Sequence, residues 1–193
     1  KRNVDHIKWN LSNIEKNGYE HFMLKEIHEQ PDTLRNCLAG RIDMENHDSK
    51  FTDKLQPEFV KNLNKIIIAS CGTSWHASLV IKHLIEKYSR IKVDVEYASE
   101  FRYKNPIINK NDLFVAISQS GETADTLAAL KTAKENGLRC FGIVNVVGSS
   151  ISREVDSGNY IRAGSEIGVA STKSFTGQVL CGILLMVHLG KIK

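Results

Sequence analysis

The chain has 193 residues, of which 41% are hydrophobic and 25% are charged, so it is long enough to bury a core of ordinary size. Its formal net charge of +4 is spread along the sequence. The absence of a Lys/Arg block argues against a nucleic-acid-binding tail and leaves small anions open as ligands.

The spacing of the cysteines argues against a metal-binding or disulfide-stabilised protein. Cys37, Cys71, Cys140 and Cys181 show no C-x-x-C pattern, so we expect no metal site and no cofactor bound through thiolates. Cys140 and Cys181 lie in apolar runs and are expected to be small core residues. Nothing in the pattern favours disulfides, and the cytoplasm is the default compartment.

No targeting or membrane segment is indicated. The N-terminus is polar and charged, unlike a signal peptide. The longest apolar stretch, Val179 to Leu189, is too short to cross a bilayer and contains His188.

The first part of the chain predicts a helical extension. A helix is expected from about Tyr19 to His28, and a second, after Pro31, from residue 32 to a C-terminal Gly40. The polar residues 41–54 are expected to form a linker, and residues 57–63 a short helix. We therefore divide the chain into a linker and helical extension, 1–54, and a main domain, 55–193.

From Lys65 onward, the pattern predicts strands that alternate with helices. Strands are expected at 65–69, 93–97, 113–117, 140–144 and 160–161. Helices are expected at 75–88, 122–136 and 172–189, with single helical turns at 99–104 and within 148–154. The short apolar strands lack alternation, which is typical of a parallel sheet covered on both faces. The fold class is thus α/β, a three-layer α/β/α sandwich around a mostly parallel sheet.

One turn is unusually rich in hydroxyl groups. The apolar run 113–117 leads into Ser118-Gln119-Ser120-Gly121-Glu122-Thr123, and a helical pattern follows. The first N–H groups of a helix have no internal partner, and the helix dipole favours an anion there. A simple helix cap explains one Ser or Thr, but not this many polar side chains.

Two further turns have the same character. They are Cys71-Gly72-Thr73-Ser74 and Gly168-Val169-Ala170-Ser171-Thr172, each ahead of a helix. Neither G-x-x-x-x-G-K-[ST] nor G-x-G-x-x-G occurs, so a nucleoside triphosphate is disfavoured. Ligands bind at the carboxyl ends of parallel strands. The three turns together favour a small phosphorylated ligand with several hydroxyls.

Several residues in or near these turns have alternative interpretations. Cys71 follows a strand, as a low-pKa nucleophile can, but no His or acidic partner is evident. His76 is more simply a packing or edge residue than a base. Glu122 should point away from a bound phosphate. Lys173 could meet a ligand or form a structural ion pair, and Glu166 is expected to brace its loop rather than act as an acid.

Together the motifs resemble the sugar isomerase (SIS) domain, and specifically the first SIS domain of the glutamine–fructose-6-phosphate aminotransferase family. The resemblance is carried by four segments as they stand here. They are Tyr19 to Pro31 (YEHFMLKEIHEQP), residues 71–74 (CGTS), residues 118–126 (SQSGETADT) and residues 166–173 (EIGVASTK). Ala98-Ser99-Glu100-Phe101-Arg102-Tyr103 is similar as well.

This resemblance implies a ligand and a set of contacts. The ligand would be fructose 6-phosphate or glucosamine 6-phosphate. The phosphate would be held by Ser118, Gln119, Ser120 and Thr123, and the sugar by Thr73, Ser74, Val169 and Ser171. The family makes glucosamine 6-phosphate from fructose 6-phosphate and glutamine, and it works as a homodimer without a cofactor, a membrane or nucleic acid.

The same family places both reaction centres in other domains. Its glutaminase domain begins with a nucleophilic cysteine, whereas this chain starts at Lys1. Its second SIS domain supplies the isomerisation residues, whereas this chain stops at Lys193. We therefore expect this stretch to bind substrate without catalysing, with glutamine a partner only of the other domain. Two alternatives stay open, a phosphosugar-sensing SIS module of a transcriptional regulator and a stand-alone phosphosugar isomerase.

Overall fold

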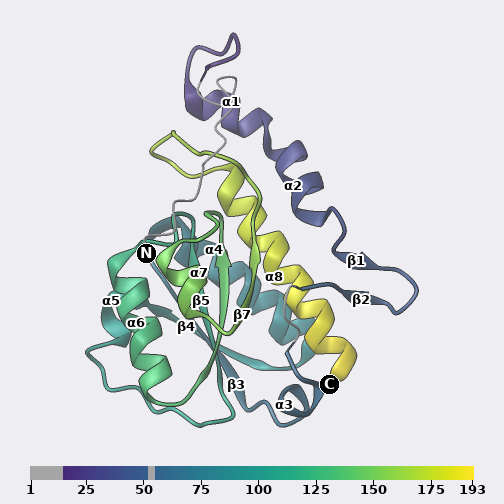
Figure 1. The fold of residues 1–193 in the computed structure, drawn as a ribbon, viewed down its shortest axis with the longest axis vertical. Coiled ribbons are helices and arrows are strands. Elements are labelled where there is room, and N and C mark those ends of the chain that lie inside the picture. The colour runs from purple at the N-terminus through teal and green to yellow at the C-terminus, as the bar shows by residue number, and fades with distance from the viewer. Residues whose placement is uncertain (1–14, 52–54) are drawn as a thin grey trace, which may run out of the picture.

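The computed structural model describes residues 15–51 and 55–193 and is built on one five-stranded sheet. All neighbouring strands in this sheet run parallel, in the order β4-β3-β5-β6-β7 (Figure 1). The strands are β3 (Lys65–Ser70), β4 (Lys92–Tyr97), β5 (Leu113–Ser118), β6 (Arg139–Val144) and β7 (Ser157–Tyr160). The predicted three-layer α/β/α sandwich is confirmed.

Helices cover both faces of the sheet, and the alternation of side chains along the strands shows how. Ile66 and Ile68 of β3 belong to one buried cluster, whereas Ile67 and Ala69 belong to the other. The first face is covered by α3 (Pro57–Lys61), α4 (Gly72–Leu84) and α8 (Lys173–Ile192). The second is covered by α5 (Ala98–Phe101), α6 (Ala124–Glu135) and α7 (Ser150–Glu154).

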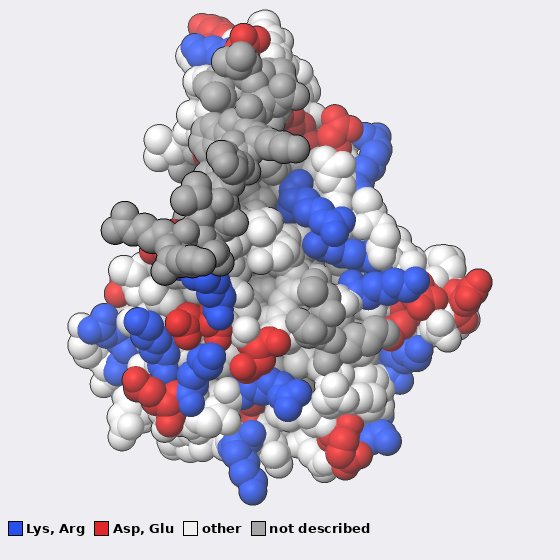
Figure 2. All heavy atoms as spheres, viewed as in Figure 1, with Lys and Arg blue, Asp and Glu red and all other residues white. Residues whose placement is uncertain are grey.

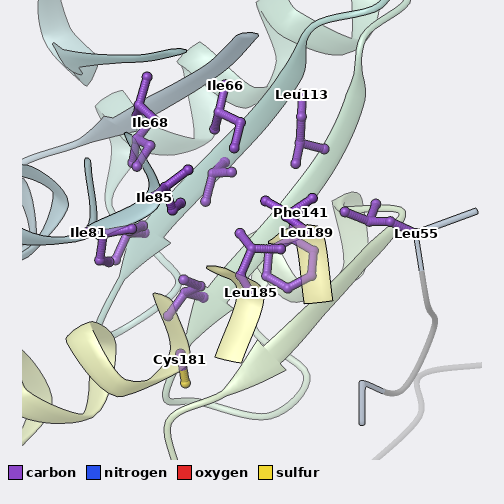
Figure 3. Packing of buried hydrophobic residues seen from close by; sticks show 14 of the residues in the cluster. Leu55, Ile66, Ile68, Ile81, Ile85, Leu113, Phe141, Cys181, Leu185 and Leu189 are labelled. Carbon is purple, nitrogen blue, oxygen red and sulfur yellow. The ribbon is translucent and has the colours of Figure 1, made fainter. Parts of the chain in front are cut away.

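The first face carries the larger cluster of bulky side chains. Figure 3 shows Ile66 and Leu113 of the sheet facing Leu185 and Leu189 of α8, with Phe141 of β6 beside them. These side chains are fully buried. Because each such side chain contributes roughly 1.5–3 kcal/mol on burial, α8 is a principal source of stability.

Helix α8 approaches its neighbours closely because it carries glycines. A Cβ added at Gly177 would lie 2.2 Å from Ile161 Cγ2, and one at Gly182 would lie 2.4 Å from Ile81 Cγ1. By length and composition alone, this 20-residue helix could cross a membrane, and it extends beyond the apolar stretch expected from the sequence. Here it packs on the sheet as a core helix.

The N-terminal extension lies along α8. It comprises α1 (Phe22–His28), α2 (Gln30–Leu38), and a two-stranded antiparallel hairpin of β1 (Ile42–Asp43) and β2 (Asp48–Ser49) (Figure 1). Pro31 lies in the first turn of α2, and Gly40 follows that helix with φ +73°, as predicted.

The expected linker is only partly a linker. Residues 52–54 lie outside the described part of the chain, as do residues 1–14. Within the described part, the hairpin is tied to α8 by the Ser49 hydroxyl, which donates to the Leu184 carbonyl at 2.6 Å. His188 Nδ1 lies 3.0 Å from Asp48 Oδ1, and both residues are buried. These tertiary contacts give a short polar segment a fixed structure.

Other element boundaries differ modestly from expectation. Helix α4 begins at Gly72, so Thr73 and Ser74 lie in its first turn, and a π-helical turn, η2 (Ile85–Ser89), follows it. Helix α6 begins at Ala124 rather than at residue 122. Gly190 lies inside α8 instead of ending it, because its backbone stays helical.

Candidate functional site

Two of the predicted turns meet at one edge of the sheet. Strands β3 and β5 are neighbours, with Ser70 opposite Ile117, so residues 71–74 and 118–123 emerge side by side at the carboxyl ends. The chain leaves β3 toward β4 on one side and later returns on the other side as β5. Open parallel sheets generally bind ligands where the strand order reverses in this way.

Residues 118–123, the hydroxyl loop, form a compact turn at the start of α6. The Ser118 side chain is buried, and its Oγ accepts the Gly121 N–H at 3.0 Å and lies 2.9 Å from Thr123 Oγ1. Ser120 Oγ accepts the Glu122 N–H at 3.2 Å. Thr123 is the N-cap residue of α6, yet its side chain makes no capping hydrogen bond. The Thr123 hydroxyl therefore pairs with Ser118 instead of with a helix N–H group.

A second loop, residues 145–150, packs against the hydroxyl loop and supports it. The Asn145 N–H donates to the Gln119 carbonyl at 3.1 Å, and the Ile151 N–H donates to the Gly121 carbonyl at 3.0 Å. A Cβ at Gly121 would lie 2.0 Å from Ser149 Oγ. With its φ of +67°, Gly121 is thus required by the backbone and by this contact, and not only by the approach of a ligand.

This support was not recognised from the sequence. The available signal was Gly148-Ser149-Ser150, small residues that follow β6, the strand next to β5. Small residues at that position allow two loops at adjacent strand ends to pack closely.

Glu122 is directed toward α7. Its Oε1 accepts the Ser150 N–H at 2.7 Å. Hydrogen bonds from the Ser150 hydroxyl and N–H hold the pKa of Glu122 below its usual value. The carboxylate therefore neutralises the start of α7, as expected for an acid that must avoid an anion at α6.

The turn at residues 71–74 is joined to α8. The Gln178 side chain is buried, and its Nε2 donates to Ser74 Oγ at 2.9 Å. Ser78 Oγ donates to the Ser74 carbonyl at 2.8 Å, whereas Thr73 is exposed. Ser74 of α4 is thereby bonded to α8, while the exposed Thr73 side chain is accessible to a ligand.

Glu166 braces the third predicted turn, as expected. Its Oε1 accepts the N–H groups of Thr172 and Ser174, at 2.9 and 3.1 Å. Its Oε2 accepts the Ser171 hydroxyl at 3.0 Å. A carboxylate thus already occupies the N-terminus of α8, which leaves the start of α6 as the better place for a second anion.

Within this 166–172 loop, the predicted contact residues have different surroundings. Val169 is fully exposed, and Ser171 is half-buried and bound to Glu166. Figure 1 shows the loop extending beside α1, away from the rest of the sheet edge. The structure places the first two turns at the ends of neighbouring strands, and it connects the third turn to the first through α8 and Gln178.

The other candidate residues have structural partners. Lys173 is buried, and its Nζ lies 2.7 Å from Glu29 Oε2, so it forms an ion pair. His76 is exposed, and its ring packs edge-on against Trp75, with 5.2 Å between centroids. The Cys71 thiol receives a hydrogen bond from the Thr126 hydroxyl at 3.9 Å, a group that cannot act as a base near neutral pH.

The described residues contain no cluster of metal-ligating side chains. In residues 15–51 and 55–193, no group of three or more His, Cys, Asp or Glu side chains could hold a metal ion. Figure 2 shows both signs of charge spread over the face that it draws, which fits a small charged ligand better than a polyanion.

Comparisons with known proteins agree with this arrangement. The SIS domain family model matches residues 60–187. Glutamine–fructose-6-phosphate aminotransferase from Bacteroides thetaiotaomicron is 52% identical over 191 residues, which are 98% of this chain and 31% of that protein. The same enzyme from Clostridium tetani is 52% identical and is matched by 100% of this chain over 32% of its length. The chain thus spans about a third of these relatives.

A solved structure is similar as well. It is the C-terminal domain of glucosamine-fructose-6-phosphate aminotransferase from Francisella tularensis, with a TM-score of 0.85 and 41% sequence identity. The match covers 92% of this chain and 50% of that one.

Proposed function

Because the chain belongs to the SIS domain family, we propose that it is the phosphosugar-binding part of an aminotransferase that makes glucosamine 6-phosphate from fructose 6-phosphate and glutamine. The observation that carries this proposal is the start of α6. There, Ser118, Ser120 and Thr123 surround a helix N-terminus that the N-cap side chain leaves uncapped.

The phosphate is assigned to the hydroxyl loop. Ser118, Gln119, Ser120 and Thr123 offer hydroxyl and amide donors, and the α6 dipole adds partial positive charge. The competing N-terminus, that of α8, already has the Glu166 carboxylate. A dianion placed there would meet the Glu166 carboxylate directly, whereas at α6 the Glu122 carboxylate is bonded to the Ser150 N–H and Asp125 lies 3.9 Å from Arg102 Nη1.

The sugar is assigned to the neighbouring turns. Thr73 and Ser74 lie in the first turn of α4, next to the hydroxyl loop across β3 and β5. Val169 and Ser171 lie on the 166–172 loop, whose following helix contacts Ser74 through Gln178. Hydroxyl groups on these neighbouring turns suit a polyol chain.

The remaining assignments concern the whole protein. We assign residues 1–54 to an extension and residues 55–193 to the SIS domain. Glutamine is used by a domain outside this stretch, and the full-length protein is a cytoplasmic homodimer. The exposed apolar residues Leu79 and Val80 of α4 and Val187 of α8 support self-association, because they offer apolar area for an interface.

Calorimetry with glucosamine 6-phosphate on the full-length protein tests the phosphate assignment. Each hydroxyl lost in Ser118→Ala and Ser120→Ala is expected to weaken binding by about 1–3 kcal/mol, because each bonds a charged group. Thr132→Ala, at the other end of α6, is the matched control and should bind normally. Unchanged affinity in the Ser118→Ala, Ser120→Ala double variant would refute the assignment.

A coupled dehydrogenase assay tests the division of labour. Isomerisation needs a base and an acid within hydrogen-bond reach of the substrate. Glu122 and Glu166 are engaged with backbone N–H groups, and His76 packs on Trp75. We expect the 193-residue chain to convert no fructose 6-phosphate to glucose 6-phosphate. Turnover that disappears in Glu122→Gln, His76→Ala or Glu166→Gln would show that a catalytic residue lies here.

A further inference from the structure

Helix α1 carries a buried carboxylate that reaches the 166–172 loop. Glu26 is only 2% exposed. Its Oε1 accepts the Ile167 N–H at 2.6 Å and the Gly168 N–H at 3.1 Å, and its Oε2 lies 3.2 Å from the same Gly168 nitrogen. The charge of a carboxylate buried to this extent is compensated by directed N–H donors. Glu26 thereby joins α1 to residues that lie 141 and 142 positions further along the sequence.

The fit between α1 and the loop depends on a glycine. A Cβ added at Gly168 would lie 2.6 Å from Glu26 Oε2 and 3.4 Å from Met23 Cα. The backbone at Gly168 has no positive φ, so alanine is disfavoured there only by α1, because the Glu26 carboxylate would have to move away from the new methyl group. The loop therefore lies directly on the helix surface at this point.

A second contact joins α1 to the end of the same loop. Glu29 follows α1, and its Oε2 lies 2.7 Å from Lys173 Nζ at the start of α8. Its Oε1 lies 3.5 Å from Lys25 Nζ, one turn back on α1. The loop is thus held near its start by Glu26 and at its end by the Lys25–Glu29–Lys173 series.

The residues between these two contacts include Val169 and Ser171. Glu166 braces this loop against α8, but its bonds reach residues 171, 172 and 174 only. Ile167 and Gly168 depend on Glu26 instead. The position of Val169, which follows Gly168 directly, is therefore set from α1.

We propose that Glu26 is a positioning residue, which holds the Ile167 and Gly168 N–H groups so that Val169 faces the sugar beside Ser171, which Glu166 holds. This proposal rests on the proposed function, since it concerns the sugar side of that site. It assigns α1, an element outside the sandwich, to the substrate-binding geometry. Glu26 itself touches no substrate.

Amide hydrogen exchange tests the contact independently of any ligand. In Glu26→Ala, the Ile167 and Gly168 amides should exchange on the order of tenfold faster or more, because their acceptor is lost. The Thr172 and Ser174 amides, which Glu166 binds, should keep their protection. Unchanged exchange at 167 and 168 would overturn the proposal. Glu20→Gln, an exposed glutamate just before α1, is the matched control.

Binding to the full-length protein tests the consequence. Glu26→Ala and Gly168→Ala should each weaken the binding of glucosamine 6-phosphate on the order of tenfold. The affinity for inorganic phosphate, measured by competition, should stay unchanged in both variants. Glu26→Gln keeps one acceptor oxygen and should bind more tightly than Glu26→Ala. Equal losses for both ligands, or normal sugar-phosphate affinity despite fast exchange at 167 and 168, would overturn the positioning role.

These measurements separate this proposal from the proposed function. If the unaltered protein fails to bind glucosamine 6-phosphate, the proposed function is wrong, and a positioning role toward that sugar falls with it. If the unaltered protein binds and the Glu26 variants bind equally well, only the positioning role is wrong.

Discussion

Replacing Gly121 with alanine is expected to destabilise the fold through two separable effects. Its φ of +67° lies in the left-handed region, which costs an L-residue roughly 1–2 kcal/mol. The new methyl group would also lie 2.0 Å from Ser149 Oγ and 2.5 Å from Ser149 Cβ. Overpacking of this kind costs roughly 1–3 kcal/mol. We expect Gly121→Ala to lower the free energy of unfolding by about 2–5 kcal/mol.

A second substitution isolates the steric part. Ser149→Gly removes both atoms that the new methyl group would meet, whereas Ser149→Ala would remove Oγ but leave Cβ at 2.5 Å. Ser149 makes no capping bond to α7 through its side chain, so its loss alone should cost little. The double variant should therefore recover about 1–3 kcal/mol relative to Gly121→Ala, and retain the backbone cost.

Urea denaturation of the four proteins measures this coupling. Equal m-values, the slopes of the free energy of unfolding against urea concentration, would confirm that the same unfolding transition is compared in all four. If the effects of Gly121→Ala and Ser149→Gly simply add, the two loops do not press on each other as described. In that case residues 145–150 would not support the hydroxyl loop.

Three further expectations concern other contacts. Glu166→Ala removes the carboxylate at the start of α8 and should lower the free energy of unfolding by about 1–2 kcal/mol, with Glu166→Gln in between, as chemical denaturation would show. A hydrogen bond with Cys181 and the charge of Arg41 lower the pKa of Cys37 to about 7 from 9.0, so the unfolded chain binds more protons between these values. The free energy of unfolding should rise with pH across that window, and this slope should vanish in Cys37→Ser. His188→Ala should lower the melting temperature, since it leaves Asp48 buried without its imidazole partner, whereas His188→Gln should recover part of the loss.

Much of the sheet could be predicted because its strands are buried on both faces. The run Ile66 to Ala69 is apolar on successive residues, a pattern that favours a strand buried on both faces. The turns after β3 and β5 could be placed together for the same reason, since parallel strands end at one edge. The bracing role of Glu166 was also accessible, because its partners lie within eight residues.

What escaped prediction depends on contacts between distant residues. The hairpin near Asp48 is short and polar, and it is fixed by His188, 140 positions away. The contact of Glu26 with Ile167 joins segments that share no local pattern. Ser149 beneath Gly121 requires knowledge of the strand order, which periodicity alone does not supply.

The place of α8 in the chain has a consequence for biosynthesis. Because this helix follows every strand, the ribosome produces the whole sheet, with α3 and α4, before the last of the helices that cover its first face. Until α8 emerges, Ile66 and Phe141 have no Leu185 or Leu189 to pack against. Apolar surface exposed in this way is what chaperones bind and what drives aggregation. We therefore expect a chain truncated before α8 to aggregate more readily than the whole one.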